Sequence, residues 1–324
     1  MKPRLKLVVR TLAAFALSAG LVAWVLSRAD LSALARRTAD MRPLPMLVAA
    51  GCSMAVLLLR AQRFYALAER SPYPVVVAAV AVQNFLVRVT PFRVGELGLP
   101  VVLQRHADEP LVRSVVNVVL VRLVELWMLL LLGAGATAAY VGPSGGLGST
   151  LTLSLLAAVT AAVFTFRWWL GALTALARRL WPRGDGTTSL GAKIHKTLDR
   201  LTEVLADGSR LSLSARLRLG LGTGAIAIFQ YSLYAALLAV FGVSVGPVEV
   251  LVGGTAAQFA AAVPVPSVGC IGPLESAWVA GFTWVGVSLD DAIVTAVGCQ
   301  VITLVFAGVF AALAWFWLGA RRRA

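Results

Sequence analysis

Charged residues are missing from long stretches of this chain. None occurs between Glu125 and Arg167, which lie about 40 positions apart. A helix of about 20 apolar residues crosses a bilayer, so this stretch can cross twice, with a turn at the glycine-rich residues 142–148. A water-soluble helix needs a polar face, which these segments lack. With 59% hydrophobic residues and a mean hydropathy of +0.84, the composition predicts a polytopic helical membrane protein.

Residues that bind metals and nucleotides are also scarce. His106 and His195 are the only histidines, and the cysteines Cys52, Cys270 and Cys299 lie in apolar segments without a zinc-binding spacing. The chain has no Gly-x-x-x-x-Gly-Lys-Ser/Thr motif, so we do not expect this polypeptide to hydrolyse ATP. We therefore predict no metal and no cofactor.

The 29 basic residues, against 15 acidic ones, predict the orientation in the membrane. They gather in short clusters beside apolar segments, which is typical of orientation signals, and we predict no nucleic-acid partner. Most of them fall on the cytoplasmic side if both termini are cytoplasmic and the two interrupted apolar regions, about 75–104 and 249–286, each enter and leave by the same side. The apolar segments long enough for full spans are roughly 8–27, 44–64, 115–140, 150–168, 218–241 and 292–318.

The predicted fold is therefore all-α, with about six full spans and two re-entrant broken-helix hairpins of opposite orientation. The first span follows a basic start, and we interpret it as an uncleaved helix rather than a signal peptide. We expect a single integral membrane domain over 1–324, with halves at about 1–140 and 150–320. The cytoplasmic linker, about 170–216, contains an amphipathic helix that either packs on the bundle or lies on anionic lipid headgroups.

The first interrupted region contains a break at Pro91 and Gly95, with charged residues beside it. Proline removes a backbone donor and glycine permits a turn, so the helix is expected to stop there. Arg88, Arg93 and Glu96 next to this break would be costly in hydrocarbon unless they line a water-filled cavity. The alternative is a kinked helix whose charges reach the cytoplasmic surface. Asn84 opens the same segment.

The second interrupted region carries several helix breakers before a glutamate. They are Pro264, Pro266, Gly269 and Gly272, followed by Glu275. Gln258 lies about one and a half turns before them. The run is more apolar than an ordinary extracytoplasmic loop, which is the alternative interpretation.

Broken segments that enter from opposite faces are typical of a transporter, whose binding site lies near the middle of the bilayer. Exposed helix amides together with Arg88 and Arg93 suit an anionic group such as a phosphate. Arg122 and Glu125 share one helix face and form either a structural ion pair or part of the cavity lining. Arg60 and Arg63, which end the second span, either extend to the membrane surface or contact the ligand.

These residues resemble those of a known family. The pair Arg60 and Arg63, the element Pro91-Phe92-Arg93-Val94-Gly95-Glu96, the element Arg122-Leu123-Val124-Glu125 and the break from Pro264 to Glu275 are similar to the lysylphosphatidylglycerol synthase transmembrane-region family, also called the flippase-like domain family. Members commonly carry an arginine where this chain has Leu99. Some are fused to a soluble aminoacyl-transferase domain, which we do not expect here because the chain stops at Ala324. Other relatives are associated with hopanoids or lipid-linked glycans.

The resemblance implies a bacterial plasma-membrane protein that moves an anionic phospholipid or a lipid-linked headgroup between leaflets. Arg88, Arg93 and Arg122 would bind phosphate, and Glu96, Glu125 and Glu275 would balance their charge. We do not expect catalysis. Two alternatives remain open: an intramembrane enzyme that uses Glu96 or Glu275 as general acid or base, and a structural partner of a separate lipid-modifying synthase. Assembly into a homo-oligomer is compatible with all three.

Overall fold

The computed structural model describes residues 42–90, 94–141, 176, 213–262 and 272–321, and within these ranges every regular element is helical. Four of the described helices are long and apolar enough to cross a membrane, as expected of a multi-pass membrane protein. They are α3 (Pro43–Tyr65), α6 (Leu111–Val141), α9 (Leu213–Val240) and α12 (Leu289–Arg321).

These four helices match four of the six predicted spans. The predicted spans at 8–27 and 150–168 lie outside the described residues, and so does most of the linker expected at 170–216. The linker is shorter than predicted at its end, because α9 already begins at Leu213.

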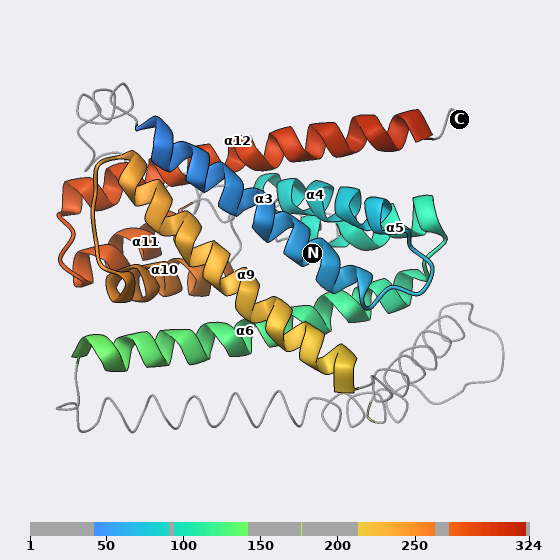
Figure 1. Cartoon of the computed structure of the whole chain (residues 1–324), viewed down its shortest axis with the longest axis horizontal. Helices are drawn as coiled ribbons and strands as arrows, with labels where there is room; N and C mark the ends of the chain where they lie inside the picture. Colours follow the sequence, from blue (N-terminus) through green and yellow to red (C-terminus); the bar gives the residue numbers. More distant parts are fainter. Residues whose placement is uncertain (1–41, 91–93, 142–175, 177–212, 263–271, 322–324) are drawn as a thin grey trace, which may run out of the picture.

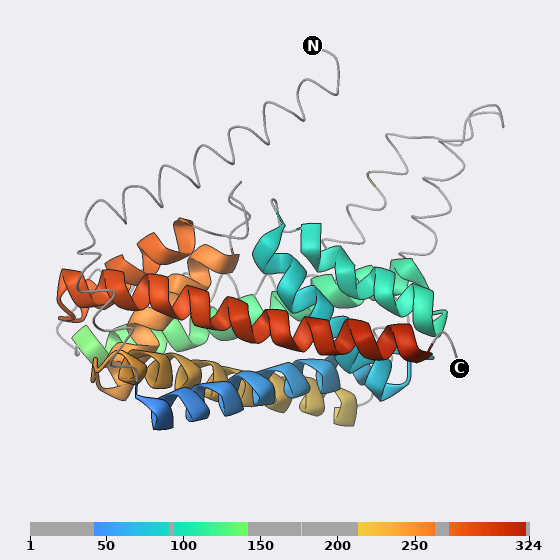
Figure 2. The ribbon, with the colours of Figure 1, turned by 90° about the horizontal axis from the view of Figure 1, so that it is seen from above.

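Both interrupted regions consist of two short helices separated by a break. In the first, α4 (Tyr73–Val89) is followed by the 3-10 turn η1 (Val94–Leu97) and α5 (Gly98–Ala107); in the second, α10 (Pro247–Ala262) is followed by α11 (Pro273–Trp284). The two helices of each pair pack against each other. The α4–α5 pair lies toward one end of the bundle and the α10–α11 pair toward the other (Figures 1 and 2). This arrangement agrees with opposed hairpins, and their re-entry into a membrane stays a prediction.

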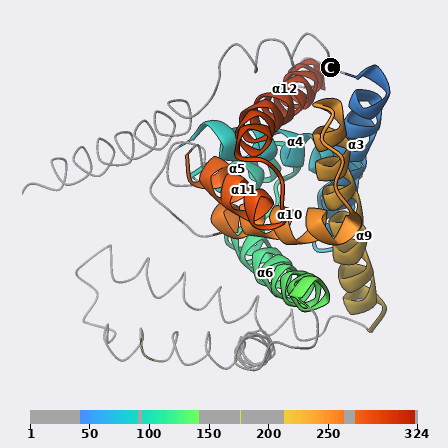
Figure 3. The same ribbon diagram turned by 90° about the vertical axis from the view of Figure 1, so that its left-hand side faces the viewer.

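The two halves of the chain pack in the same pattern. α6 of the first half packs on α10 of the second, and α12 of the second half packs on α4 of the first. The equivalent long helices α3 and α9 lie side by side (Figure 3). Exchanging α3 with α9, α4 with α10, α5 with α11 and α6 with α12 therefore maps these contacts onto themselves. An internal repeat of inverted orientation has this property.

The surface of the long helices is apolar where lipid is expected. Val301, Val305, Val309 and Leu313 follow one another at intervals of four on α12, and each is 51–65% exposed. Residues four apart lie on one face of a helix, so they form a continuous apolar stripe. A stripe of this size is unfavourable in water but is the normal surface of a helix in hydrocarbon.

A buried carboxylate joins the α3–α4 loop to the connection between α5 and α6. Glu109, between α5 and α6, is 1% exposed. It accepts hydrogen bonds from the backbone N–H groups of Glu69 and Arg70, at 3.1 and 3.0 Å, and from Oγ of Ser71 at 3.1 Å. Because these three residues belong to the α3–α4 loop, the two connections meet at one end of the bundle.

Candidate functional site

The first break is stabilised by a side chain of α4 and by Thr90, the residue that follows this helix. Thr90 Oγ1 donates to the carbonyl of Leu86 at 2.7 Å and accepts from the N–H of Gly95 at 2.8 Å. Nε2 of Gln83 donates to the carbonyl of Glu96 at 3.1 Å. Backbone groups freed by the break thus find partners, as they must away from water. A Cβ at Gly95 would collide with the backbone of Leu86, so this position requires glycine.

A chain of ion pairs connects α3, α6 and η1. The carboxylate of Glu125 accepts from Arg63 of α3 and, at 2.7 Å, from Nη1 of Arg122 on its own helix. Nε of Arg122 lies 3.3 Å from Oε1 of Glu96 in η1. Arg63 also donates to Oγ1 of Thr223 on α9, at 3.3 Å. The predicted pair of Arg122 with Glu125 is therefore present, as one part of a larger network.

The side chain of Arg63 does not extend to the membrane surface, which was one of the two interpretations of its position in the sequence. Its residue is 4% exposed, and its guanidinium points inward to Glu125. A carboxylate partner in the interior stabilises the charged group, which removes the need to reach water. Arg60 is half-buried and its Nη1 donates to Oδ1 of Asn84 at 3.1 Å. It too points toward the interior, where it lines a cavity.

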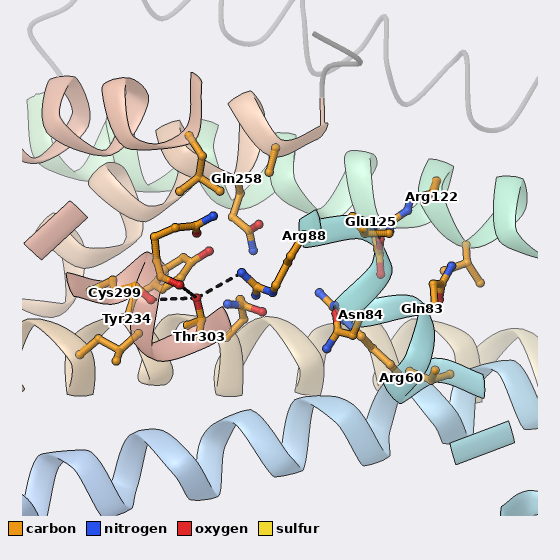
Figure 4. A pocket seen from close by; sticks show the side chains of 18 of the residues that line it. Arg60, Gln83, Asn84, Arg88, Arg122, Glu125, Tyr234, Gln258, Cys299 and Thr303 are labelled. Carbon is orange, nitrogen blue, oxygen red and sulfur yellow. Dashed lines mark hydrogen bonds and ion pairs between the residues drawn. The ribbon is translucent and has the colours of Figure 1, made fainter. Parts of the chain in front are cut away.

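The polar cavity lies between the two helix pairs. It has a volume of about 140 Å³, while an ordered water needs only about 10–15 Å³ of such space. Figure 4 shows Arg60, Asn84 and Glu125 around one part of it and Tyr234, Gln258 and Thr303 around another. The described polar residues of its lining are Arg60, Arg63, Gln83, Asn84, Arg88, Arg122, Glu125, Gln230, Tyr234, Gln258, Gln300 and Thr303.

The side chain of Arg88, in the first half of the chain, contacts a helix of the second half. Its Nη1 donates to Oγ1 of Thr303 on α12 at 3.1 Å. Four arginines thus line the polar cavity, and the one carboxylate among its described lining residues is Glu125. The cavity is therefore electropositive and suits an anionic ligand.

An apolar groove of about 660 Å³ adjoins the polar cavity. Side chains of α6 and α9, among them Leu126, Leu129 and Ile226, form its walls. The groove and the cavity share the lining residues Arg60, Arg122, Glu125, Gln230, Gln258 and Ala261. One end of the groove is therefore polar and continuous with the cavity.

Glu275 caps a helix, which differs from its predicted role of balancing the charge of the arginines. Its Oε2 accepts from the backbone N–H of Gly272 at 2.6 Å, which caps the first turn of α11. Gly272 has a φ of +95°, which favours glycine. Glu275 is buried and is absent from the described lining of both cavities, so the structure does not bring it together with the arginines.

Several predicted site residues lie outside the described residues. They are Pro91, Arg93, Pro264, Pro266 and Gly269. Sequence reasoning in turn missed Thr90, Gln230, Gln300 and Tyr234, of which only Thr90, beside the predicted break, carried a local signal. In the described part of the chain, no three His, Cys, Asp or Glu side chains gather as a metal site would require.

Comparison with known proteins gives one family. The family model described as "Lysylphosphatidylglycerol synthase TM region" matches residues 11–311, which covers most of the chain. No curated protein matches the chain.

Proposed function

The chain belongs to the lysylphosphatidylglycerol synthase TM region family, a membrane region linked to lipid modification, and on this premise we propose that it is a lipid transporter. The polar cavity binds the headgroup of an anionic or phosphate-bearing lipid, and the apolar groove holds its acyl chains. The protein then moves the lipid between the leaflets of the plasma membrane.

The observation that carries this proposal is the junction of a polar cavity with an apolar groove. Most ligands need only one of these environments, whereas a membrane lipid needs both, side by side. The two spaces share Arg60 and Arg122, so a phosphate at the junction would lie beside two guanidinium groups. Guanidinium groups bind phosphate oxygens through several N–H donors.

Arg60 is well suited to contact the headgroup. One of its donors is used by Asn84, while its Nε is buried and has no partner among the described residues. A buried donor without a partner is costly, so a bound phosphate oxygen that fills this role is favourable.

The opposed helix pairs support transport rather than simple binding. A site between two broken, oppositely oriented segments is accessible from either side if one half of the bundle rocks against the other. The contacts of α3 with α9, α4 with α12 and α6 with α10 join the two halves, and they are the surfaces along which one half would move against the other.

The proposal is tested by reconstitution in liposomes that contain a phospholipid labelled on its acyl chain. Movement between leaflets is followed by chemical quenching of the outer label. We expect the protein to accelerate this movement and Arg60→Gln to slow it about tenfold or more. The reason is that losing one charge-assisted hydrogen bond costs about 1.5–3 kcal/mol and each 1.4 kcal/mol is a factor of ten.

Arg113→Gln is the matched control. Arg113 lies on α6, pairs with Glu69 and is absent from the described lining of both cavities, so its loss should leave the rate unchanged. A folded protein that moves no lipid would contradict the proposal. A new covalent lipid product would instead indicate an enzyme.

A further inference from the structure

Three glutamines of the polar cavity have unused hydrogen-bonding groups. Gln230 of α9, Gln258 of α10 and Gln300 of α12 all line it. Within the described part of the chain, none of their side chains has a hydrogen-bond partner, nor has the hydroxyl of Tyr234 beside them. By contrast, the neighbouring Gln83 donates to a backbone carbonyl. All four residues are half-buried, so a ligand or water in the cavity can pair with their polar groups.

The polar cavity extends to both sides of Arg88. Figure 4 shows Gln258 and Tyr234 on one side of Arg88, and Glu125 and Arg60 on the other. A headgroup whose phosphate lies beside Arg60 would therefore extend its remaining atoms past Arg88 toward Gln258 and Tyr234.

The part of the cavity around Gln258 and Tyr234 has donors and acceptors but, among the described lining residues, no carboxylate to receive a cation. Each amide supplies two N–H donors and one carbonyl acceptor, which match hydroxyl groups, since a hydroxyl both donates and accepts. Glu125 is the one carboxylate among the described lining residues, and both of its oxygens already accept from arginines. An ammonium group would meet the positive charges of Arg88 and Arg60 without a carboxylate to pair with.

We propose that the headgroup taken by this site is a phosphate that carries an uncharged polyhydroxyl group, either a polyol or a sugar, and that headgroups with an ammonium group are rejected. This inference rests on the proposed transport function. A site built to hydrogen-bond hydroxyls discriminates strongly against an analogue that lacks them, because its own polar groups are then left unpaired.

The test compares four acyl-labelled lipids in the same proteoliposomes. Phosphatidylglycerol and phosphatidylinositol carry hydroxyls, phosphatidylmethanol has the same phosphate charge without hydroxyls, and phosphatidylethanolamine carries an ammonium group. We expect the two hydroxylated lipids to move at least about tenfold faster than the other two. Equal rates for all four, or a preference for phosphatidylethanolamine, would overturn the inference while leaving transport intact. Movement of none would contradict the transport function itself.

Two variants of Gln258 sharpen the test. Gln258→Leu should slow the movement of phosphatidylglycerol between leaflets until its rate is close to that of phosphatidylmethanol. Gln258→Glu adds a carboxylate among the amides and should raise the rate of phosphatidylethanolamine relative to phosphatidylglycerol. The same changes at Gln62, which is exposed on α3, are the matched controls and should keep the wild-type preference. If both Gln258 variants kept the wild-type preference among the lipids, the role of the amides would be refuted. If either variant fails to fold, the comparison of the four lipids with the wild-type protein decides the inference.

Discussion

Replacing Glu125 with glutamine should destabilise the protein more than any other single change in the ion-pair network. The carboxylate accepts from Arg63 and from Arg122 at the same time. The side chain of Arg63 is only 2% exposed, so without Glu125 its charge stays buried and unpaired. Removing one partner of a buried pair costs about 3–5 kcal/mol. We expect the lower end of this range, because the amide oxygen of glutamine still accepts one hydrogen bond.

The neighbouring substitutions set the scale for this effect. Arg122→Gln leaves the pair of Arg63 with Glu125 intact, and the side chain of Arg122 is 35% exposed, so we expect a loss of about 1 kcal/mol or less. Glu69→Gln removes an ion pair with Arg113 in which the glutamate is 46% exposed, and should cost no more.

The assay is reversible unfolding in mixed micelles by titration with a denaturing detergent, followed by circular dichroism. The expected order of destabilisation is Glu125→Gln well above Arg122→Gln, with Glu69→Gln close to wild type. Equal stability of Glu125→Gln and Glu69→Gln would refute the reasoning, because it would mean that Arg63 does not depend on Glu125.

Three further predictions concern the break and the end of the bundle. Gly95→Ala would press a methyl group into the backbone of Leu86, and overpacking costs about 1–3 kcal/mol, so we expect a lower thermal-unfolding temperature; an unchanged one would contradict the close approach. Thr90→Val removes the acceptor of the Gly95 N–H, and hydrogen exchange at this amide should accelerate, whereas unaltered protection would show that the bond is absent. Glu109→Gln weakens charge-assisted bonds to the α3–α4 loop by about 1.5–3 kcal/mol, and limited proteolysis should cut this loop faster; wild-type resistance would argue against the anchor.

The long helices and the position of the breaks could be predicted from the sequence. Apolar length alone identified α3 and α12 to within a few residues at each end. Proline and glycine marked the places where α4 and α10 stop. The pair of Arg122 with Glu125 was visible because residues three apart share a helix face, which is a local rule.

The inward orientation of Arg63 could not be predicted, because its partner Glu125 lies 62 positions away and meets it only through the packing of α3 against the rest of the bundle. Gln230 and Gln300 are each the one amide side chain of a largely apolar helix, and nothing local indicates that they face one cavity. The capping contact of Glu275 did have a local signal, since a glutamate three residues after a helix N-cap is the pattern of a capping box.

A density map of the protein in a phospholipid nanodisc tests the central claim most directly. The account predicts density for a phosphate within hydrogen-bond distance of Arg60 and Arg122 at the junction, with acyl-chain density along the groove between α6 and α9. Lipid density restricted to the outer surface of the bundle, with only water in the polar cavity, would contradict it.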